Sequence, residues 1–306
     1  NDKGGVLNDL VLLRLTEDEF WFSISDSDLL LWLQGVNVTK KYDVVIDEID
    51  VCPVQIQGPL SEDLMAKLAG EELRDVPYYG IMETQVGGAD VVISQTGFTG
   101  EKGYEIYVRD AHQNAEKVWN AVLEGGEEFG LMVIAPAHHR RIAAGILSWG
   151  QDLDHETSPF QVNLAYQVPR NKKADYIGKE ALEKQRAMID EGTPPFKMRM
   201  VGITLGGKEI TDYAPDFWLI ADMDGNDVGY VTSPWWSPEL GTNIALAWVP
   251  WSSSEIGTKY QVRLPDEFSE SPGVPVGAEI VDVPFRESVN PNKREVQSAK
   301  GLDFAD

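Results

Sequence analysis

Histidine and cysteine are few in this chain, and the spacing of the histidines disfavours metal chemistry. No two of the four histidines have the i, i+4 spacing that lets two imidazoles on one helix bind the same metal ion; they are His112, His138, His139 and His155. Cys52 is the single cysteine, so the chain can form neither an internal disulfide nor a cysteine-based metal site. We expect no metal, and we expect Cys52 to be a small buried apolar residue.

Common catalytic signatures are also missing from the sequence. There is no G-x-S-x-G nucleophile elbow, no P-loop, and no G-x-G-x-x-G that follows a strand and opens a helix. Other short segments are more informative.

Five such segments stand in one order over most of the chain. They are GGVLNDLV at residues 4–11, VQIQGP at 54–59, TGFTGEKGYEI at 96–106, RIAAGILSWGQDLDHETSP at 141–159, and IGKEAL at 177–182. Each segment is short, but the five together resemble the glycine-cleavage T-protein superfamily. The resemblance implies a folate-dependent one-carbon transferase, with tetrahydrofolate in a central channel of a three-lobed fold.

The same resemblance assigns roles to individual residues. Asp9 matches the catalytic aspartate of the superfamily, and a fixed carboxylate stabilises positive charge in a site that excludes water. Glu105 matches the glutamate that recognises the pterin, because a carboxylate can accept two hydrogen bonds from an aminopyrimidine edge. The expected cofactor-binding set is Glu105, Tyr104, Asn8, Ser25 and Arg141. Without the resemblance, Asp9 would be interpreted as a solvated turn residue and Glu105 as a solvent-facing strand residue.

Aromatic side chains offer a site for the donor. Trp149, Trp235 and Trp236 are candidates to hold an onium methyl group through cation–π attraction of about 0.5 to 2 kcal/mol, although core packing is an alternative role for each.

Departures from the aminomethyltransferase pattern bear on the substrate. Asn8 replaces the first of two successive aspartates, Ser25 stands where an asparagine is usual, and Ala137 takes the place of a folate-contacting arginine. Similar departures occur in the dimethylsulfoniopropionate demethylase branch, which residues 22–30 and 242–245 also resemble. Residues 99–101 keep the aminomethyltransferase form of the glycine-rich turn.

Three functions therefore remain open at this point. The first is a methyltransferase that moves a methyl group from a small onium compound to N5 of tetrahydrofolate. The second is the aminomethyltransferase of glycine cleavage, which needs a lipoyl-carrier protein as partner. The third is a non-enzymatic folate-binding accessory protein, whose branch has a Lys-Gly-Cys-Tyr motif that is missing around Cys52.

Composition limits the partners. The chain has 306 residues, 50 of them acidic and 26 basic, and its net charge of −24 argues against nucleic acid and anionic membranes as partners. No apolar run reaches the roughly 20 residues that a membrane helix needs, and we expect a cytoplasmic protein. The charge suits a salt-adapted source or simply good solubility. A homodimer is a further possibility.

The helices and strands that must position these residues can be predicted from the sequence pattern. Together they indicate an α+β fold with a C-terminal antiparallel β-barrel. The predicted strands of the first part cover residues 10–15 and 20–25, which form a hairpin, and 42–46, 53–57, 89–94 and 104–108. The predicted helices cover 28–34, 61–70, 111–124, 137–147 and 179–189. Short apolar runs near 198–205, 218–221, 228–231, 244–249 and 260–264 predict the barrel.

Domain boundaries follow from the same pattern. We expect a folate-binding α+β region of two lobes at residues 1–192, a barrel domain at 196–286, and a polar tail at 287–306. Members of the superfamily usually carry further residues before the first motif, which starts here at Gly4. We therefore expect the first lobe to be incomplete at its N-terminus, leaving one face of the first hairpin uncovered.

Overall fold

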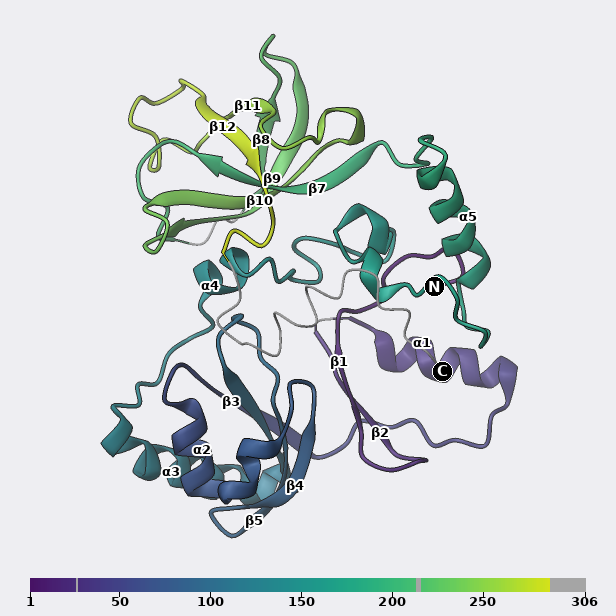
Figure 1. The fold of residues 1–306 in the computed structure, drawn as a ribbon, viewed down its shortest axis with the longest axis vertical. Helices are drawn as coiled ribbons and strands as arrows, with labels where there is room; N and C mark the ends of the chain where they lie inside the picture. Colours follow the sequence, from purple (N-terminus) through teal and green to yellow (C-terminus); the bar gives the residue numbers. More distant parts are fainter. Residues whose placement is uncertain (26, 213–215, 287–306) are drawn as a thin grey trace.

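The computed structural model describes residues 1–25, 27–212 and 216–286, which form three lobes joined through a central region (Figure 1). The helices are α1 (Leu29–Lys40), α2 (Ser61–Ala69), α3 (Ala111–Gly126), α4 (His138–Ala143) and α5 (Lys179–Asp190). The strands are β1 (Val11–Arg14), β2 (Phe20–Ser23), β3 (Val51–Gln57), β4 (Ile81–Val86), β5 (Ala89–Ser94), β6 (Gly103–Arg109), β7 (Met198–Leu205), β8 (Trp218–Ala221), β9 (Asp227–Ser237), β10 (Thr242–Pro250), β11 (Lys259–Val262) and β12 (Val276–Val281). No described helix is long and apolar enough to cross a bilayer.

The first lobe is a four-stranded antiparallel sheet of order β3-β6-β5-β4 with α2 and α3 packed on one face. Successive residues of a strand point to opposite faces, and β6 follows this rule closely. Tyr104, Ile106 and Val108 join the core under the helices, whereas Tyr107 joins a smaller core on the other face. Glu105 lies between Tyr104 and Ile106, so it shares the face of Tyr107.

The hairpin β1-β2 covers that second face. Its inward residues Leu13 and Trp21 are buried against Val92 and Tyr107, which confirms the predicted hairpin. The outward residues Leu12, Phe20 and Phe22 are exposed by 44 to 55% of their surface. One face of the hairpin is thus covered and the other is open within the described residues.

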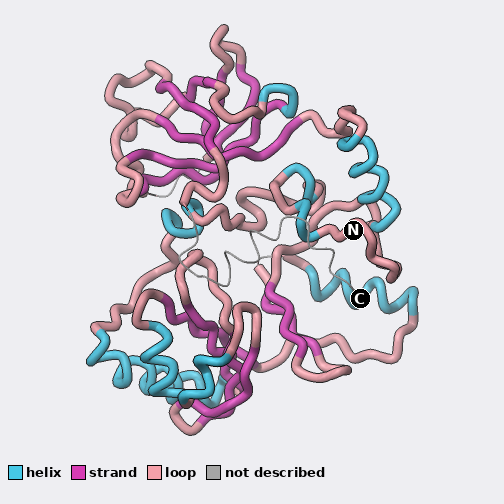
Figure 2. Tube along the Cα trace, in the orientation of Figure 1, coloured by secondary structure: helices cyan, strands magenta, loops and turns pink. Residues whose placement is uncertain are grey.

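The third lobe is a closed six-stranded barrel of order β10-β7-β12-β11-β8-β9, with every pairing antiparallel. Inward residues of alternating strand positions fill it, for example Ile203, Ile220 and Val262, each of which is fully buried. The α+β fold with a C-terminal antiparallel barrel is confirmed. Figure 2 shows that loops predominate where the three lobes meet.

Several element predictions were wrong in detail. Residues 42–46 form no strand, and Val44 and Val45 are exposed there, so a local apolar run without a neighbouring strand or core did not become one. The helix predicted at 28–34 extends to Lys40, and the one predicted at 137–147 ends at Ala143, just before Gly145 at φ 68°. Strands β4 and β12 were missed, and Cys52 is exposed rather than buried. The predicted polar tail lies outside the described residues.

Candidate functional site

Asp9 lies in the wall of a pocket of about 550 Å³ between the first hairpin, α1 and the start of α5. The segment before β1 provides one side of the pocket, and the chain between residues 159 and 182 provides the other. The lining residues are Asn1, Val6, Leu7, Asn8, Asp9, Leu10, Leu29, Trp32, Pro159, Leu164, Gln167, Val168, Pro169, Lys172, Tyr176, Ile177 and Leu182. Most are apolar, as is usual for sites that bind small organic molecules.

The Asp9 carboxylate has no hydrogen-bond or ion-pair partner among the described residues. Its side chain keeps exposed surface toward the pocket, yet burial of its surroundings raises its pKa above the ordinary value. The two observations agree because a carboxylate in a cavity wall is reachable by a small molecule while protein replaces much of its bulk water. Asp9 is therefore a sheltered negative charge available to a cationic ligand.

Asn8 fixes the backbone beside Asp9. Its Nδ2 donates to the Ser25 carbonyl oxygen at 3.0 Å and to Ser27 Oγ at 2.8 Å, while its Oδ1 accepts from the Ser25 amide at 3.2 Å. An aspartate at position 8 could accept from Ser25 but could not donate to it. The structure brings together Asn8 and Ser25, which were both predicted to bind cofactor. Their hydrogen bonds join the segment before β1 to the segment after β2 at the base of the hairpin.

Glu105 faces the hairpin from β6 and is half-buried. Its Oε2 accepts hydrogen bonds from Thr96 Oγ1 and, at 3.1 Å, from the Tyr107 hydroxyl. No donor to Oε1 is present in the part of the chain that the structure describes. One carboxylate oxygen is thus held in place and the other can accept a hydrogen bond from a ligand.

Two tyrosines interact electrostatically with the two carboxylates, Tyr166 with Asp9 and Tyr78 with Glu105. Burial raises the pKa of Tyr166, with Tyr79 and Asp9 adding to the rise, and burial also raises the pKa of Tyr78, to which Tyr79, Tyr166 and Glu105 contribute. The Tyr78 and Tyr79 rings are 4.3 Å apart. Tyr79 is exposed and has φ 64°, a left-handed conformation that costs a bulky residue backbone strain. The three tyrosines influence one another electrostatically, and Tyr166 also senses Asp9 whereas Tyr78 senses Glu105.

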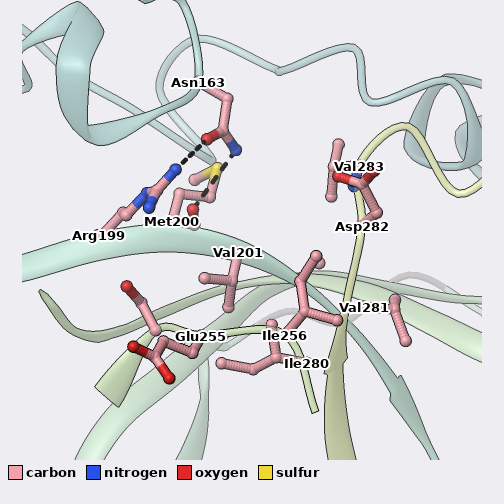
Figure 3. Close-up of a pocket in the computed structure, with 12 residues that line it drawn as sticks. Asn163, Arg199, Met200, Val201, Glu255, Ile256, Ile280, Val281, Asp282 and Val283 are labelled. Atoms are coloured by element: carbon pink, nitrogen blue, oxygen red, sulfur yellow. Dashed lines mark hydrogen bonds between the residues drawn. The ribbon is translucent and has the colours of Figure 1, made fainter. Parts of the chain in front are cut away.

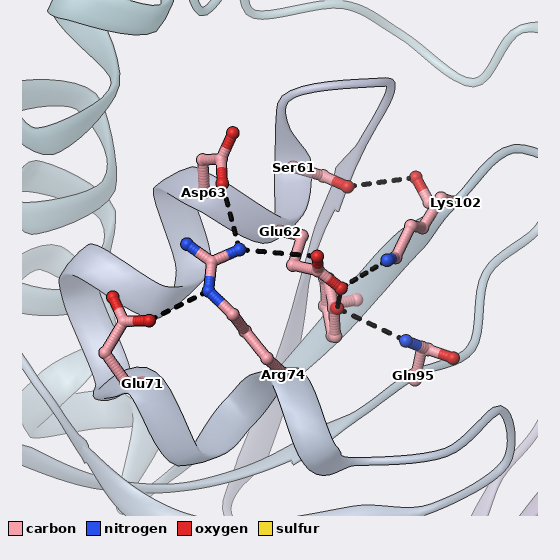
Figure 4. Close-up of polar contacts among 8 residues, drawn as sticks. Ser61, Glu62, Asp63, Glu71, Arg74, Gln95 and Lys102 are labelled. Carbon is pink, nitrogen blue, oxygen red and sulfur yellow. Dashed lines mark hydrogen bonds and ion pairs between the residues drawn. The ribbon is translucent and has the colours of Figure 1, made fainter.

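Tyr104, predicted to bind cofactor, lies on the opposite face of the sheet. It is fully buried, and its hydroxyl accepts from Gln95 Nε2 at 3.2 Å and donates to Glu62 at 3.3 Å. Figure 4 shows Glu62 between Arg74 and Lys102, with Gln95 close by. This cluster ties the glycine-rich turn to α2, and the alternation along β6 separates it from Glu105.

Arg141, also predicted to bind cofactor, is enclosed in a polar network. Its Nη1 lies 2.5 Å from Asp152, and its Nη2 donates to Ser233 Oγ at 2.7 Å. Asp152 accepts in addition from Thr232 and from the Ser148 amide. The guanidinium is buried and joins α4 to β9 of the barrel, so the structure does not place it with Asp9 or Glu105.

The three tryptophans occupy two locations. Trp149 Nε1 donates to the Val6 carbonyl at 3.4 Å, and its ring packs in the core beside Val6, which lines the Asp9 pocket. Trp235 stacks on His138 at a ring distance of 5.6 Å, and Trp236 follows it on β9. None of the three lines the Asp9 pocket.

Sequence reasoning missed residues that the structure places at the site. Trp32, Tyr176 and Lys172 line the pocket, and Tyr107 holds Glu105. Tyr107 could have been found from the sequence, because it stands two positions after Glu105 on a predicted strand and so shares its face. Lys172 lies in a loop, where no periodicity indicates which way a side chain points. No group of three or more potential metal ligands occurs among the described residues.

Asp9 in a pocket wall and the half-buried Glu105 on β6 are thus set in a three-lobed fold (Figure 1). The family description "GCVT N-terminal domain" matches residues 1–172, and "Glycine cleavage T-protein C-terminal barrel domain" matches residues 199–285. The chain belongs to the glycine cleavage T-protein family.

Known proteins of two kinds resemble the chain. A dimethylsulfoniopropionate demethylase, DmdA, of Ruegeria pomeroyi is 34% identical over 264 residues, which are 86% of this chain and 69% of that protein. An aminomethyltransferase of Chloroherpeton thalassium is 29% identical over 291 residues, covering 93% of this chain and 74% of that protein. The crystal structure of aminomethyltransferase T from Bartonella henselae superposes with a TM-score of 0.68 at 23% identity, over 94% of this chain and 74% of that one. It shows the shared fold.

Family members use tetrahydrofolate, and the residues present here suit that group. An aminopyrimidine edge needs an acceptor oxygen, which Glu105 Oε1 provides, and aromatic rings of Tyr78 and Tyr79 offer flat apolar surface beside it.

Proposed function

We propose that this chain transfers a methyl group from a small onium carboxylate, such as dimethylsulfoniopropionate, to N5 of tetrahydrofolate. The observation that carries the proposal is a pocket whose wall contains the carboxylate of Asp9 and the ammonium group of Lys172, neither of which forms an ion pair with another described residue. The demethylase of Ruegeria pomeroyi, similar over 86% of this chain, supports it.

The pocket lining contains one carboxylate and one ammonium group, which match the two charges of such a donor. Asp9 can hold the onium cation, and the apolar walls with Trp32 and Tyr176 suit its methyl groups. The Lys172 ammonium has no carboxylate partner among the described residues and lies 5.6 Å from the Tyr176 ring centre. It can pair with the carboxylate of the donor, so one molecule would satisfy both charges.

Methyl transfer from a sulfonium requires the protein mainly to align the donor with the acceptor and to place a negative charge beside them. Bound tetrahydrofolate supplies the nucleophilic nitrogen that accepts the methyl group. The carbon–sulfur bond breaks with its electron pair going to sulfur, which leaves as a neutral thioether, while a nitrogen–carbon bond forms at N5 and the N5 proton is released to water. Asp9 lies opposite the positive charge that moves from sulfur toward the acceptor, and alignment in a dry pocket lowers the barrier by several kcal/mol.

Aminomethyl transfer is the second candidate. Aminomethyltransferases of Thermotoga maritima and Clostridium botulinum are 32% and 31% identical to the chain over 81% and 86% of its length, close to the value for the demethylase. A carboxylate at position 9 also suits an iminium-like centre. Lys172 is the feature that separates the two, since a carrier-bound aminomethyl group has no carboxylate of its own.

The folate product distinguishes the candidates. The chain is incubated with tetrahydrofolate and, in parallel, with sulfonium carboxylates, betaines and an aminomethylated lipoyl carrier, and the product is identified by mass spectrometry. We expect 5-methyltetrahydrofolate from an onium carboxylate. Methylenetetrahydrofolate formed from the carrier, with no product from any onium donor, contradicts methyl transfer and selects the second candidate.

A further inference from the structure

A second cavity of about 330 Å³ lies where the barrel meets the loop around Asn163, and it shares no lining residue with the Asp9 pocket. Its walls come from the start of β7, the loop after β10, and the end of β12 (Figure 3). Its size falls at the low end of the roughly 300 to 1,000 Å³ of small-molecule sites. No function discussed so far uses it.

Arg199 places a positive charge at this cavity, and no carboxylate of the described residues forms an ion pair with it. Its Nη2 donates to Asn163 Oδ1 at 3.1 Å, and its guanidinium lies 5.3 Å from the Trp251 ring centre. Within the described residues it forms no ion pair, its Nη1 has no acceptor, and its Nε is buried without one. Burial lowers the pKa of Arg199, which means that the protein leaves this charge incompletely compensated.

Asn163 holds the guanidinium from the side of the loop. It has φ 62°, in the left-handed region that asparagine tolerates better than most residues, and its Nδ2 donates to the Met200 carbonyl at 3.5 Å. Arg199 is therefore held by a neutral partner, and its positive charge remains available to pair with an anionic group of a ligand.

Carboxylates line the same cavity and do not pair with Arg199. Glu255 forms no ion pair or side-chain hydrogen bond among the described residues, and Asp282 uses one oxygen to accept from the Val283 amide. Apolar residues separate these charges, and they include Val201, Ile256, Ile280 and Val281 (Figure 3). Arg199 and Asp282 lie on opposite sides of the cavity with apolar residues between them, whereas Glu255 lies on the side of Arg199 (Figure 3).

We propose that this cavity binds an aliphatic α-amino acid as a zwitterion. The ligand's carboxylate accepts from the Arg199 guanidinium, its ammonium pairs with Asp282 across the cavity, and its branched side chain packs on the exposed Ile256 (Figure 3). A simple anion would meet two carboxylates, and a simple cation would meet Arg199, so a ligand with both charges fits better than either.

Calorimetry with L-leucine tests the site on the intact chain. We expect saturable binding that weakens at least about tenfold, or about 1.4 kcal/mol, in Arg199→Met, and that Ile256→Trp abolishes by filling the cavity. Ile256 is 69% exposed, so its replacement leaves folding intact even where Arg199→Met does not. Arg263→Met is the matched control, because Arg263 pairs with Asp227 on the barrel surface outside the cavity.

The Asp9→Asn variant separates this site from the Asp9 pocket, and it should bind leucine as the unchanged chain does. Two analogues test the charges: 4-methylpentanoate lacks the ammonium and 3-methylbutylamine lacks the carboxylate, and both should bind more weakly. Absence of leucine binding at about 10 mM, undiminished binding in Ile256→Trp, or loss in Asp9→Asn would each overturn the proposal. None of these results depends on methyl transfer.

Discussion

Asp9 is a carboxylate whose surroundings favour a cationic partner. Protein replaces water around it, its pKa is raised, and Asn8 fixes the adjacent backbone through Ser25 and Ser27. A charge that is held in place before the reaction costs no reorganisation when positive charge moves past it.

Replacing Asp9 by Asn should therefore lower kcat by at least about a hundredfold while changing tetrahydrofolate affinity little, because the lost interaction belongs to the transition state. Steady-state kinetics and folate calorimetry on the same preparation measure both quantities. A variant with unchanged kcat and an intact fold would exclude Asp9 from the reaction.

The raised pKa of Asp9 also has a consequence for stability. Below the ordinary pKa of an aspartate, about 3.9, the side chain is protonated in the folded and unfolded states alike and contributes no difference. As pH rises from there through the higher folded-state pKa, the folded chain binds more protons than the unfolded one, so stability is lost. Asp9→Asn should match the original chain in acid and become the more stable of the two toward neutral pH. Denaturant unfolding across that range measures the difference, and a variant less stable at pH 7 contradicts it.

Lys172 faces the same pocket with the opposite charge. Lys172→Met should raise KM for an onium carboxylate about tenfold or more and leave kcat within a few-fold, because the carboxylate is distant from the transferred methyl group. Lys184→Met, at an exposed position of α5 outside the pocket, is the control. Equal KM values for the two variants would remove Lys172 from donor recognition.

Among the secondary-structure elements, the short helix α4 is held in position by contacts with the barrel. Its Arg141 is buried against Asp152, and both bond to Ser233 of β9, so the ion pair fastens α4 and the loop after it to the third lobe. A buried pair of this kind gives little net stability when complete but is costly to break, since the remaining charge stays buried.

Arg141→Met should lower the free energy of unfolding by about 3 to 5 kcal/mol through the uncompensated Asp152 carboxylate. Arg170→Met is the matched comparison, because Arg170 and Asp190 form an exposed pair whose loss costs at most about 1 kcal/mol. Urea unfolding of both variants gives the two values. Similar values would mean that the buried network contributes no more than a surface pair.

At the scale of the whole molecule, net charge influences stability. With 50 acidic and 26 basic residues, compacting the chain brings like charges together. Raising NaCl from about 10 to about 150 mM shortens the Debye length from about 30 to about 8 Å and should raise the melting temperature by several degrees. Thermal unfolding at constant pH measures this. A melting temperature that falls with salt would indicate that attractive ion pairs outweigh the repulsion.

The site itself exists only in the whole molecule. Asp9 precedes β1 and Lys172 lies before α5, yet both line one pocket. The segment before β1 and the chain between residues 159 and 182, which are distant in sequence, together form its walls.

The sequence by itself determined the family, the α+β class, the barrel and the first hairpin. These features depend on local patterns. For example, β7 and β8 were predicted at their observed bounds, because a short apolar run between turn-forming residues can be recognised without knowing its partner strand. Asp9 and Glu105 were predicted as site residues from motif resemblance.

Only the tertiary structure decided which neighbours of those motifs share the site. Tyr104 and Glu105 are adjacent in sequence, but strand alternation and the hairpin on one face sent them to opposite sides of the sheet. Arg141 was drawn into a buried ion pair by Asp152, and Lys172 was brought to Asp9 by the fold of a loop. Contacts between residues distant in sequence depend on packing, which no local pattern encodes.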